Sequence, residues 1–384
     1  MKTSVVTFFR LLLCGAVLAG VSEIRPSFAQ AKPKVVASHS VLCDLTQQVA
    51  RNTIDMTCLI EAGEDPHVYN PKPSDRRAIE DADLILYGGY GFEPSIIKMI
   101  EATNSSAPKI ALSEVSVTKP VLAEKHDHGG EDHDEHEHDD DHGKAKDHDD
   151  HGKDHDEHDD HGKDHDEHDD HDDHGKDHDD HDDKHHKDEA HKEDLEPDPH
   201  VWHDPENGMA MVKQIQKQLS AVVPDQADLY RSNADALTVK LKELDSWIRG
   251  QINTIPENKR ILITQHDALG YYTKAYGLEE DAALRSFSTE TRPSAAQIRS
   301  LVQLIKAKGV STVFFESTSN PRLVKTLARE AKVAVSSDPI YADSLGLEET
   351  TASTYQGMLM TNTCVIVEGL GGQCNQAEAQ ALLP

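Results

Sequence analysis

The chain has 384 residues and a formal net charge of −31, of which residues 124–196 carry −26 and all the others only −5. A basic face of the kind that nucleic-acid binding needs is therefore not evident, and a 5% aromatic fraction offers no platform for stacking bases. The length suits two or three domains with a substantial core.

The first 30 residues indicate export. Two basic residues and the apolar run Leu11–Ala19 precede Ser27-Phe28-Ala29, a small-x-small pattern suited to signal-peptidase cleavage. We expect residues 1–29 to be a signal peptide and the mature chain to be periplasmic. The run is too short for a permanent membrane anchor. Lipid anchoring through Cys14 is an alternative, although the small residues that normally precede a lipidated cysteine are missing.

After the leader, short β-rich runs alternate with helical patterns, which is typical of βαβ units and parallel sheets. The expected strands are Lys34–Ala37, Met56–Ile60, Leu84–Tyr87 and Lys109–Leu112 in a first lobe, and Arg260–Gln265, Thr312–Phe315 and Val333–Ser336 in a second. Helical patterns at Ser294–Lys308 and Arg322–Lys332 separate the later strands.

The apolar spacing of Asp225–Ile252, which follows Pro224, predicts one long helix between the two lobes. The expected organisation is thus an N-terminal α/β lobe at residues 30–224, a linking helix at 225–253 and a C-terminal α/β lobe at 254–384.

Residues 124–196 are of low complexity. His151–Asp160 reads HGKDHDEHDD, His161–Asp170 repeats it identically, and His174–Asp183 differs by one residue. Such a stretch cannot bury enough apolar surface to fold, so we expect a disordered loop inserted in the first lobe. The imidazoles would bind several zinc ions weakly, and the carboxylates would attract cations. The loop is interpreted as a zinc collector; a solubilising segment that binds metal incidentally is the alternative.

Four cysteines remain when the leader is left out. An even number of cysteines in a protein exported to an oxidising compartment favours disulfides. The pairs Cys43–Cys58 and Cys364–Cys374 are the expected disulfides, and buried free thiols are the alternative. No Cys-x-x-Cys spacing occurs, so a thiolate metal site or a redox motif has little support.

Of the 25 histidines, 20 lie between His126 and His191, and the other five are His39, His67, His200, His203 and His266. His67 and His200 occupy matching motifs, Asp-Pro-His-Val-Tyr and Asp-Pro-His-Val-Trp, on either side of the loop. His67 would follow the second strand and His266 the first strand of the second lobe, at carboxyl ends where open α/β sheets bind ligands. Three imidazoles with a carboxylate or water suit Zn²⁺, although histidine alone does not exclude Ni²⁺, Cu²⁺ or Co²⁺.

Asp343 follows the last strand and would add an oxygen to these three imidazoles, or else cap a helix before Ser344-Leu345. His39 and His203 are expected to be hydrogen-bonded polar groups outside the site. Three carboxylates, Asp204, Asp267 and Glu316, are candidates for orienting the ligand imidazoles, although helix capping or solvation explains them equally well.

The two Asp-Pro-His motifs, the His-rich insertion, Gln265-His266-Asp267-Ala268-Leu269-Gly270-Tyr271 and Asp343-Ser344-Leu345 together resemble the ZnuA-like zinc-binding subunits of ABC importers. The resemblance covers residues 33 to 372. It implies two four-stranded α/β lobes, a rigid helix that joins them, and a metal in the interlobe cleft bound by His67, His200 and His266, with Asp343 as a fourth candidate. Manganese receptors of this family generally carry a glutamate where this chain has His266, so the resemblance favours zinc.

The predicted function is that of a monomeric periplasmic receptor, not an enzyme, which captures Zn²⁺ between the lobes and delivers it to the membrane permease of an ABC importer. With one long helix as connector, closure should be small and local movement near His200 should gate the site. A metal buffer based on the loop alone is one alternative. A zinc metallohydrolase is another, but His-Glu-x-x-His and Gly-x-Ser-x-Gly motifs and a Walker loop are absent.

Overall fold

The computed structural model describes residues 31–124, 195–284, 286–290 and 292–384. The expected signal peptide lies outside these residues, as does almost all of the His/Asp loop. The expected loop boundaries at residues 124 and 196 fall inside two short strands, β5 (Leu122–Glu124) and β6 (Leu195–Pro197), which pair in a two-stranded sheet. Backbone pairing thus includes Glu124 and Glu196, the two residues at the ends of the predicted loop.

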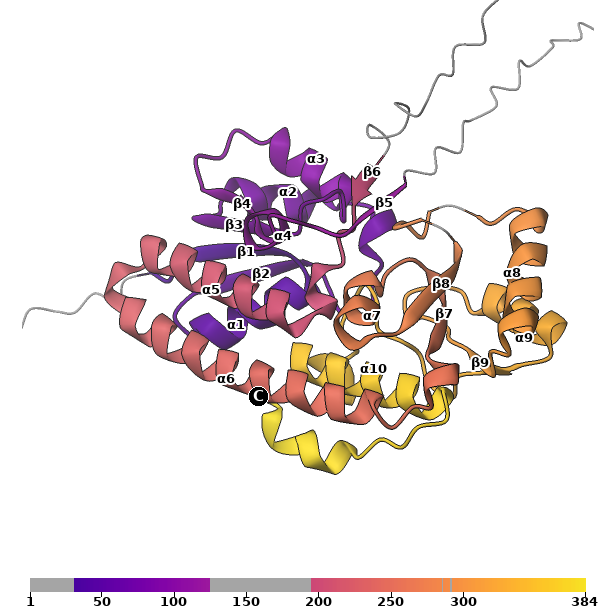
Figure 1. The fold of residues 1–384 in the computed structure, drawn as a ribbon. Coiled ribbons are helices and arrows are strands. Elements are labelled where there is room, and N and C mark those ends of the chain that lie inside the picture. The colour runs from indigo at the N-terminus through magenta and orange to yellow at the C-terminus, as the bar shows by residue number, and fades with distance from the viewer. Residues whose placement is uncertain (1–30, 125–194, 285, 291) are drawn as a thin grey trace, which may run out of the picture. The chain divides into compact units, whose positions relative to one another are not determined.

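The first lobe is built on a four-stranded parallel sheet in the order β2-β1-β3-β4, as the sequence predicts. Its strands are β1 (Lys34–His39), β2 (Asp55–Ile60), β3 (Leu84–Tyr87) and β4 (Lys109–Ala111). The helices and the 3-10 turn among them are α1 (Ser40–Ala50), η1 (Pro66–Val68), α2 (Pro73–Glu80), α3 (Pro94–Glu101) and α4 (Leu112–Ser116). Because these strands are parallel, the carboxyl ends of β1, β2 and β3 lie at one edge of the sheet, and η1 follows the end of β2. Figure 1 shows this sheet with α2, α3 and α4 near it.

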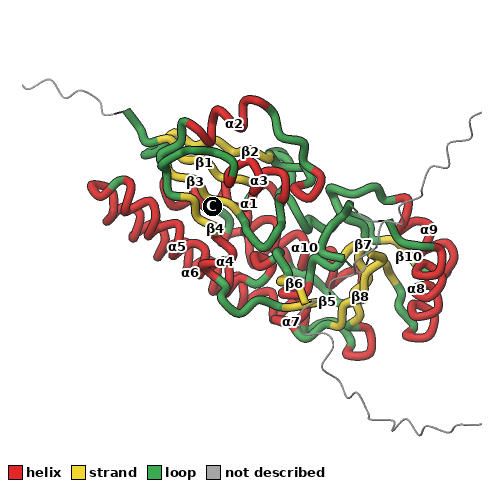
Figure 2. The backbone as a smooth tube through the Cα atoms, turned by 90° about the horizontal axis from the view of Figure 1, so that it is seen from above, coloured by secondary structure: helices red, strands yellow, loops and turns green. Residues whose placement is uncertain are grey.

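Two long helices connect the lobes. After the turn η2 (Val201–His203), α5 (Pro205–Val222) packs along α6 (Ala227–Ile252), with the turn η3 (Pro224–Gln226) between them. The 26-residue α6 lies within the predicted linking helix and has a buried stripe that includes Leu237, Leu241 and Leu244. Figure 2 shows the two helices side by side from a second direction. The helix α6 also contacts α1 of the first lobe and the C-terminal helix α10 (Tyr355–Gly369).

The second lobe contains two parallel two-stranded ladders. Its strands are β7 (Ile261–His266), β8 (Glu279–Leu284), β9 (Thr312–Val313) and β10 (Ala334–Val335). The ladders β7-β8 and β9-β10 meet where the amide of Phe314 donates a hydrogen bond of 2.8 Å to the carbonyl oxygen of Ile263. The strand β8 was not predicted, because its first residues, Glu279, Glu280 and Asp281, have low strand propensity.

The remaining helical elements of the second lobe begin with η4 (Glu257–Lys259) and α7 (Gly270–Tyr276). They continue with α8 (Ala295–Lys308), α9 (Arg322–Ala331), η5 (Thr351–Ser353) and η6 (Gln376–Leu382). The helix α8 begins with a capping box, in which the hydroxyl of Ser294 accepts from the amide of Gln297 while the side chain of Gln297 accepts from the amide of Ser294. It ends at Gly309, whose φ of 64° is strained for other residues.

Both expected disulfides are present. Cys43–Cys58 joins α1 to β2 and closes a separation of 15 residues, and Cys364–Cys374 joins α10 to the segment that follows it, across 10 residues. Among the described residues, no helix is both long enough and apolar enough to cross a membrane.

Candidate metal centre

The first predicted ligand, His67, lies in the 3-10 turn η1 a few residues after β2. Asp65 starts this turn, because its Oδ1 accepts a hydrogen bond of 3.0 Å from the amide of His67, and Pro66 restricts the backbone between them. The His67 side chain is buried, with Nε2 directed at the side chains of His200 and Asp343.

The second Asp-Pro-His motif has the same hydrogen bond from the histidine amide to the aspartate and adds one contact, although its 3-10 turn η2 begins only after His200. Asp198 Oδ1 accepts from the amide of His200 at 2.9 Å and also lies 2.9 Å from His200 Nδ1. This second contact selects the tautomer that carries the Nδ1 proton, so His200 Nε2 presents a lone pair to the centre of the cluster. The role of Asp198 was missed in the sequence, although the residue belongs to the motif that identified His200.

The third imidazole, His266, is the last residue of β7 and is held by Glu316. Glu316 Oε2 lies 2.6 Å from His266 Nδ1, and Oε1 accepts from the amides of Gln265 and His266 at 2.8 and 3.0 Å. Glu316 thus contacts a candidate ligand imidazole, as predicted, and that His266 binds a metal stays a prediction. Asp204, a second candidate for such a role, instead caps α5 by accepting from the amide of Glu206.

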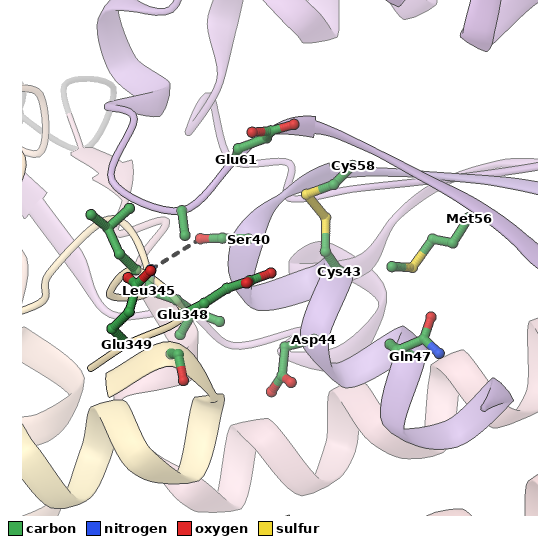
Figure 3. A pocket seen from close by; sticks show the side chains of 13 residues that line it. Ser40, Cys43, Asp44, Gln47, Met56, Cys58, Glu61, Leu345, Glu348 and Glu349 are labelled. Atoms are coloured by element: carbon green, nitrogen blue, oxygen red, sulfur yellow. Dashed lines mark hydrogen bonds between the residues drawn. A yellow bond between two sulfur atoms is a disulfide. The ribbon is translucent and has the colours of Figure 1, made fainter. Parts of the chain in front are cut away.

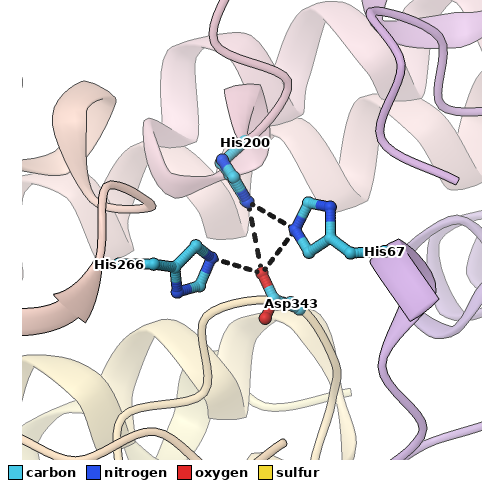
Figure 4. Close-up of side chains that lie close together, drawn as sticks. All are labelled: His67, His200, His266 and Asp343. Carbon is cyan, nitrogen blue, oxygen red and sulfur yellow. Dashed lines mark hydrogen bonds and ion pairs between the residues drawn. The ribbon is translucent and has the colours of Figure 1, made fainter. Parts of the chain in front are cut away.

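The carboxylate of Asp343 lies among the three rings (Figure 4). Its Oδ1 is 3.5 Å from His67 Nε2, 3.2 Å from His200 Nε2 and 3.2 Å from His266 Nε2, while the Nε2 atoms of His67 and His200 are 3.4 Å apart. One potential ligand atom from each of the four residues lies within 4.8 Å of all the others. The helix-cap alternative for Asp343 does not apply, because the residue lies in a loop.

Hydrogen bonds to the first lobe anchor the loop that carries Asp343, at the edge of the groove drawn in Figure 3. Ser40 Oγ accepts from the amide of Leu345 at 3.0 Å, and Ser344 Oγ accepts from the amide of Gly63 at 2.8 Å. The two hydroxyl oxygens are 3.2 Å apart. Asp343 is therefore positioned by the first lobe, although it belongs to the second lobe in chain order.

The four groups are electrostatically complementary. Burial acts to raise the pKa of Asp343, but the adjacent His266, His200 and His67 outweigh it and hold this pKa well below its usual range. Burial acts to lower the pKa of His266, but the charges of Glu316 and Asp343 raise it well above normal. The pKa of His200 is likewise raised by Asp198 and Asp343 against the effect of burial. A buried carboxylate surrounded by imidazoles gives a site that accepts positive charge.

Aromatic rings enclose the first-lobe side of the cluster. The buried ring of Phe92 packs edge-on against His67, His200 and Trp202, with centroids 5.0, 5.4 and 4.7 Å away. Phe92 was missed because no motif marks it and its sequence distance from both histidines is large. Its ring restricts the rotation of both first-lobe imidazoles and keeps water from their apolar faces.

The two other histidines of the described structure, His39 and His203, pack against the ring of Trp202. His203 Nε2 is 2.8 Å from the carbonyl oxygen of Ala342, which satisfies one ring nitrogen as expected. The expectation for His39 was wrong, because neither of its ring nitrogens has a hydrogen-bond partner among the described residues. Burial and the neighbouring His200 lower the pKa of His39 to about 3, so the ring is neutral and packs as an aromatic group against Phe92 and Trp202.

Residues 35–369 match the protein family described as the periplasmic component A of a zinc-uptake complex, ZnuA. The chain belongs to the ZnuA family. This match spans nearly the whole chain and both halves of the site. It assigns the protein to the metal receptors that serve as substrate-binding components of ABC importers, a class of transport proteins and not of enzymes.

Individual relatives of this ZnuA-family chain carry different metal names. The manganese ABC transporter substrate-binding lipoprotein PsaA of Streptococcus mitis is 27% identical over 371 residues, which is 95% of this chain and 98% of the relative. The manganese-binding lipoprotein MntA of Halalkalibacterium halodurans is 27% identical, over 93% of each chain.

Solved structures show the same fold. The periplasmic zinc-binding protein TroA of Treponema pallidum matches 88% of this chain and 99% of its own, with a TM-score of 0.68 and 23% identity. The manganese-bound periplasmic metal-binding protein of Candidatus Liberibacter asiaticus matches 88% of this chain and all of its own, with a TM-score of 0.63 and 22% identity. The α/β fold with parallel sheets flanked by helices is therefore that of TroA.

Proposed function

We propose that this protein is a periplasmic receptor that captures Zn²⁺ at His67, His200, His266 and Asp343 and delivers it to the permease of an ABC importer. The observation that carries the proposal is the convergence of three imidazole nitrogens and one carboxylate oxygen from segments far apart in the sequence. Zinc is the transported ion and not a resident cofactor.

The spacing of these atoms supports four-coordinate binding. Zinc–nitrogen bonds are about 2.0–2.1 Å long, and the edge of a tetrahedron is about 1.6 times the distance from its centre to a corner, which gives roughly 3.3 Å between ligand atoms. Four of the six separations, all except those between His266 and the other two imidazoles, are 3.2, 3.2, 3.4 and 3.5 Å. These four distances are close to the edge length of a tetrahedral zinc site, which supports the proposal.

The donor set also favours zinc over manganese. Manganese prefers oxygen ligands and a higher coordination number, whereas imidazole nitrogen suits zinc. His266 supplies a third nitrogen. Manganese receptors of the family that this chain resembles generally have a glutamate at that position. The manganese names of several relatives make this the part of the proposal that most needs a direct test.

The remaining parts of the proposal rest on sequence and on the disulfides. The leader-like residues 1–29 and two disulfides are consistent with an oxidising compartment outside the cytoplasm. The His/Asp loop would raise the local zinc concentration near a monomeric receptor. In this proposal the ion lies between the two lobes, and α6 is the connector.

The test is a calorimetric zinc titration of the chain without residues 125–194, together with its His67→Ala and His266→Ala variants. We expect one tight site that survives loop deletion and is lost in both variants, because each removes a ligand. In the full chain, His151→Ala serves as a matched control that removes a histidine of the loop and should keep the tight site.

Three outcomes would overturn the proposal. Loss of tight binding with the loop would make the protein a loop-based zinc buffer, and tighter binding of manganese than of zinc would make it a manganese receptor. Metal-dependent turnover of ester, phosphate or peptide substrates would favour a metallohydrolase.

A further inference from the structure

The two carboxylate oxygens of Asp343 have different surroundings. Oδ1 faces the three imidazoles, whereas Oδ2 accepts a hydrogen bond of 3.1 Å from the hydroxyl of Thr318. The Asp343 side chain is fully buried, so water does not compete for either oxygen from outside. Thr318 itself is half-buried and lines an opening of about 610 Å³ that also borders Asp65, Gln265 and Thr289.

The chain directly before Thr318 is hydrogen-bonded to the segment around Ile340. Glu316, two residues before Thr318, forms a parallel bridge with Ile340, and the amide of Ser317 donates to the carbonyl oxygen of Ile340 at 2.9 Å. Glu316 also holds His266, so residues 316–318 contact two of the four proposed ligands. The threonine hydroxyl therefore reaches Asp343 from a bend that begins at this hydrogen-bonded segment.

The coordination mode of a carboxylate affects which metal a site prefers. A carboxylate that binds through one oxygen adds one ligand, and one that binds through both adds two. With three imidazoles, the first mode gives the four-coordination typical of zinc, and the second gives five ligands and more oxygen, which suits manganese better. Whatever holds the second oxygen away from the ion therefore affects the selectivity of the site.

We propose that Thr318 is a specificity-determining positioning residue that holds Oδ2 of Asp343 and so limits this carboxylate to one-oxygen metal binding. The inference rests on the proposed function, since it requires Asp343 to be a ligand. Thr318 does not touch the ion; it acts through Asp343. Removing its hydroxyl leaves Oδ2 without its donor, and turning toward the metal then becomes the best way to satisfy that oxygen.

The test compares the full chain with its Thr318→Val and Thr318→Ser variants. Valine keeps the shape but lacks the hydroxyl, and serine keeps the hydroxyl. For Thr318→Val we expect the ratio of the manganese to the zinc dissociation constant to fall about tenfold, the effect of one net hydrogen bond. Thr318→Ser should retain the wild-type ratio. Dissociation constants are measured by competition with a chromophoric chelator.

Cobalt(II) absorption reports the coordination number directly. Four-coordinate cobalt absorbs more strongly in the visible range than five-coordinate cobalt, so the band should weaken in Thr318→Val and persist in Thr318→Ser. The full-chain His266→Ala variant provides the blank for cobalt bound by the loop. Thr318→Ala, which also lacks the hydroxyl, replaces the valine variant if thermal melting shows that valine disturbs the fold.

The outcomes separate the two proposals. An unchanged metal ratio and cobalt spectrum in both Thr318→Val and Thr318→Ala would overturn the role of Thr318, as would an equal weakening of both metals without a spectral change. A wild-type chain without a tight zinc site would instead overturn the proposed function itself.

Discussion

At the scale of single residues, two ligand imidazoles are oriented by carboxylates that the protein buries beside them. Asp198 holds His200 and Glu316 holds His266, each at Nδ1, so that both rings present Nε2 to the same point. Such partners keep the ring in the tautomer that can bind a metal.

Glu316→Gln should weaken zinc binding about 10- to 100-fold. The glutamine amide would donate to His266 Nδ1 and place the ring proton on Nε2, where the metal would bind. Competition titration measures the effect, and Glu330→Gln, an exposed position on α9, is the matched control. Equal affinity in both variants would show that Glu316 is not needed to orient the ring.

Glu93 provides a pH-dependent test of the core beside the site. Burial raises the pKa of Glu93 from 4.5 to about 7, and the amide of Gly88, which donates to its Oε1, only partly opposes this. Between pH 4.5 and about 7, the Glu93 carboxyl loses its proton in the unfolded state but keeps it in the folded state. The free energy of unfolding therefore falls as pH rises through this range, by roughly 3 kcal/mol in total.

Glu93→Gln should remove this decrease between pH 4.5 and 7, because glutamine has no proton to lose. Urea denaturation across that range, with the exposed Glu101→Gln as control, measures the difference. The prediction fails if both variants lose stability with pH as the wild type does.

At the scale of elements, the site depends on where strands and helices end. The turn η1 follows β2, His266 ends β7, and the loop of Asp343 is bound to the start of α1 through Ser40. The Cys43–Cys58 disulfide, drawn in Figure 3, joins α1 to β2. Its contribution belongs to the stability of the first lobe, since neither cysteine contacts a proposed ligand in the described structure.

The double variant Cys43→Ala/Cys58→Ala should lower the free energy of unfolding by about 3 kcal/mol, the value expected for a closed loop of this length. Zinc affinity should stay within a factor of about two, because the ligands are held by other contacts. Urea denaturation and calorimetry measure the two quantities, and Cys364→Ala/Cys374→Ala, which opens a shorter loop, should cost somewhat less. A large loss of zinc affinity would contradict this separation of roles.

At the scale of the whole molecule, the continuous helix α6 and the anchored Asp343 loop restrict the movement of the lobes. The 26 residues of α6 form one helix, and α10 reaches the first lobe, where the amide of Tyr355 donates to Asp44 and Gln356 pairs with Gln48. A hinge like that of receptors with flexible connectors would have to break these contacts.

Zinc should therefore change the radius of gyration of the chain without residues 125–194 very little. Small-angle scattering with and without zinc measures this, and the His266→Ala variant controls for zinc bound elsewhere. A clear compaction on zinc addition that is absent from the variant would show a hinge closure and contradict the prediction of local gating near His200.

Much of the fold could be predicted because its signals are local. The signals are the strand and helix periods, the paired Asp-Pro-His motifs and the cysteine spacing, and each depends on residues close together in the sequence. The observed elements and disulfides agree with these signals. The acidic start of β8 was missed because its pairing with β7, and not its composition, makes it a strand. The three histidines of the site were singled out because few histidines lie outside the loop, and Asp343 because it follows the last predicted strand.

Sequence by itself determined the α/β class and indicated the ligand set that we propose, since these rest on short-range patterns or on rare residues. It left buried free thiols as an alternative to the two disulfides, and the structure decided for the disulfides. Only the tertiary structure decided what surrounds the site. Phe92, Asp198 and Thr318 gained their roles by packing or hydrogen bonding with residues brought close by the fold. His266 and Glu316, 50 residues apart, meet because β7 and the segment after β9 lie side by side, and no local pattern encodes that contact.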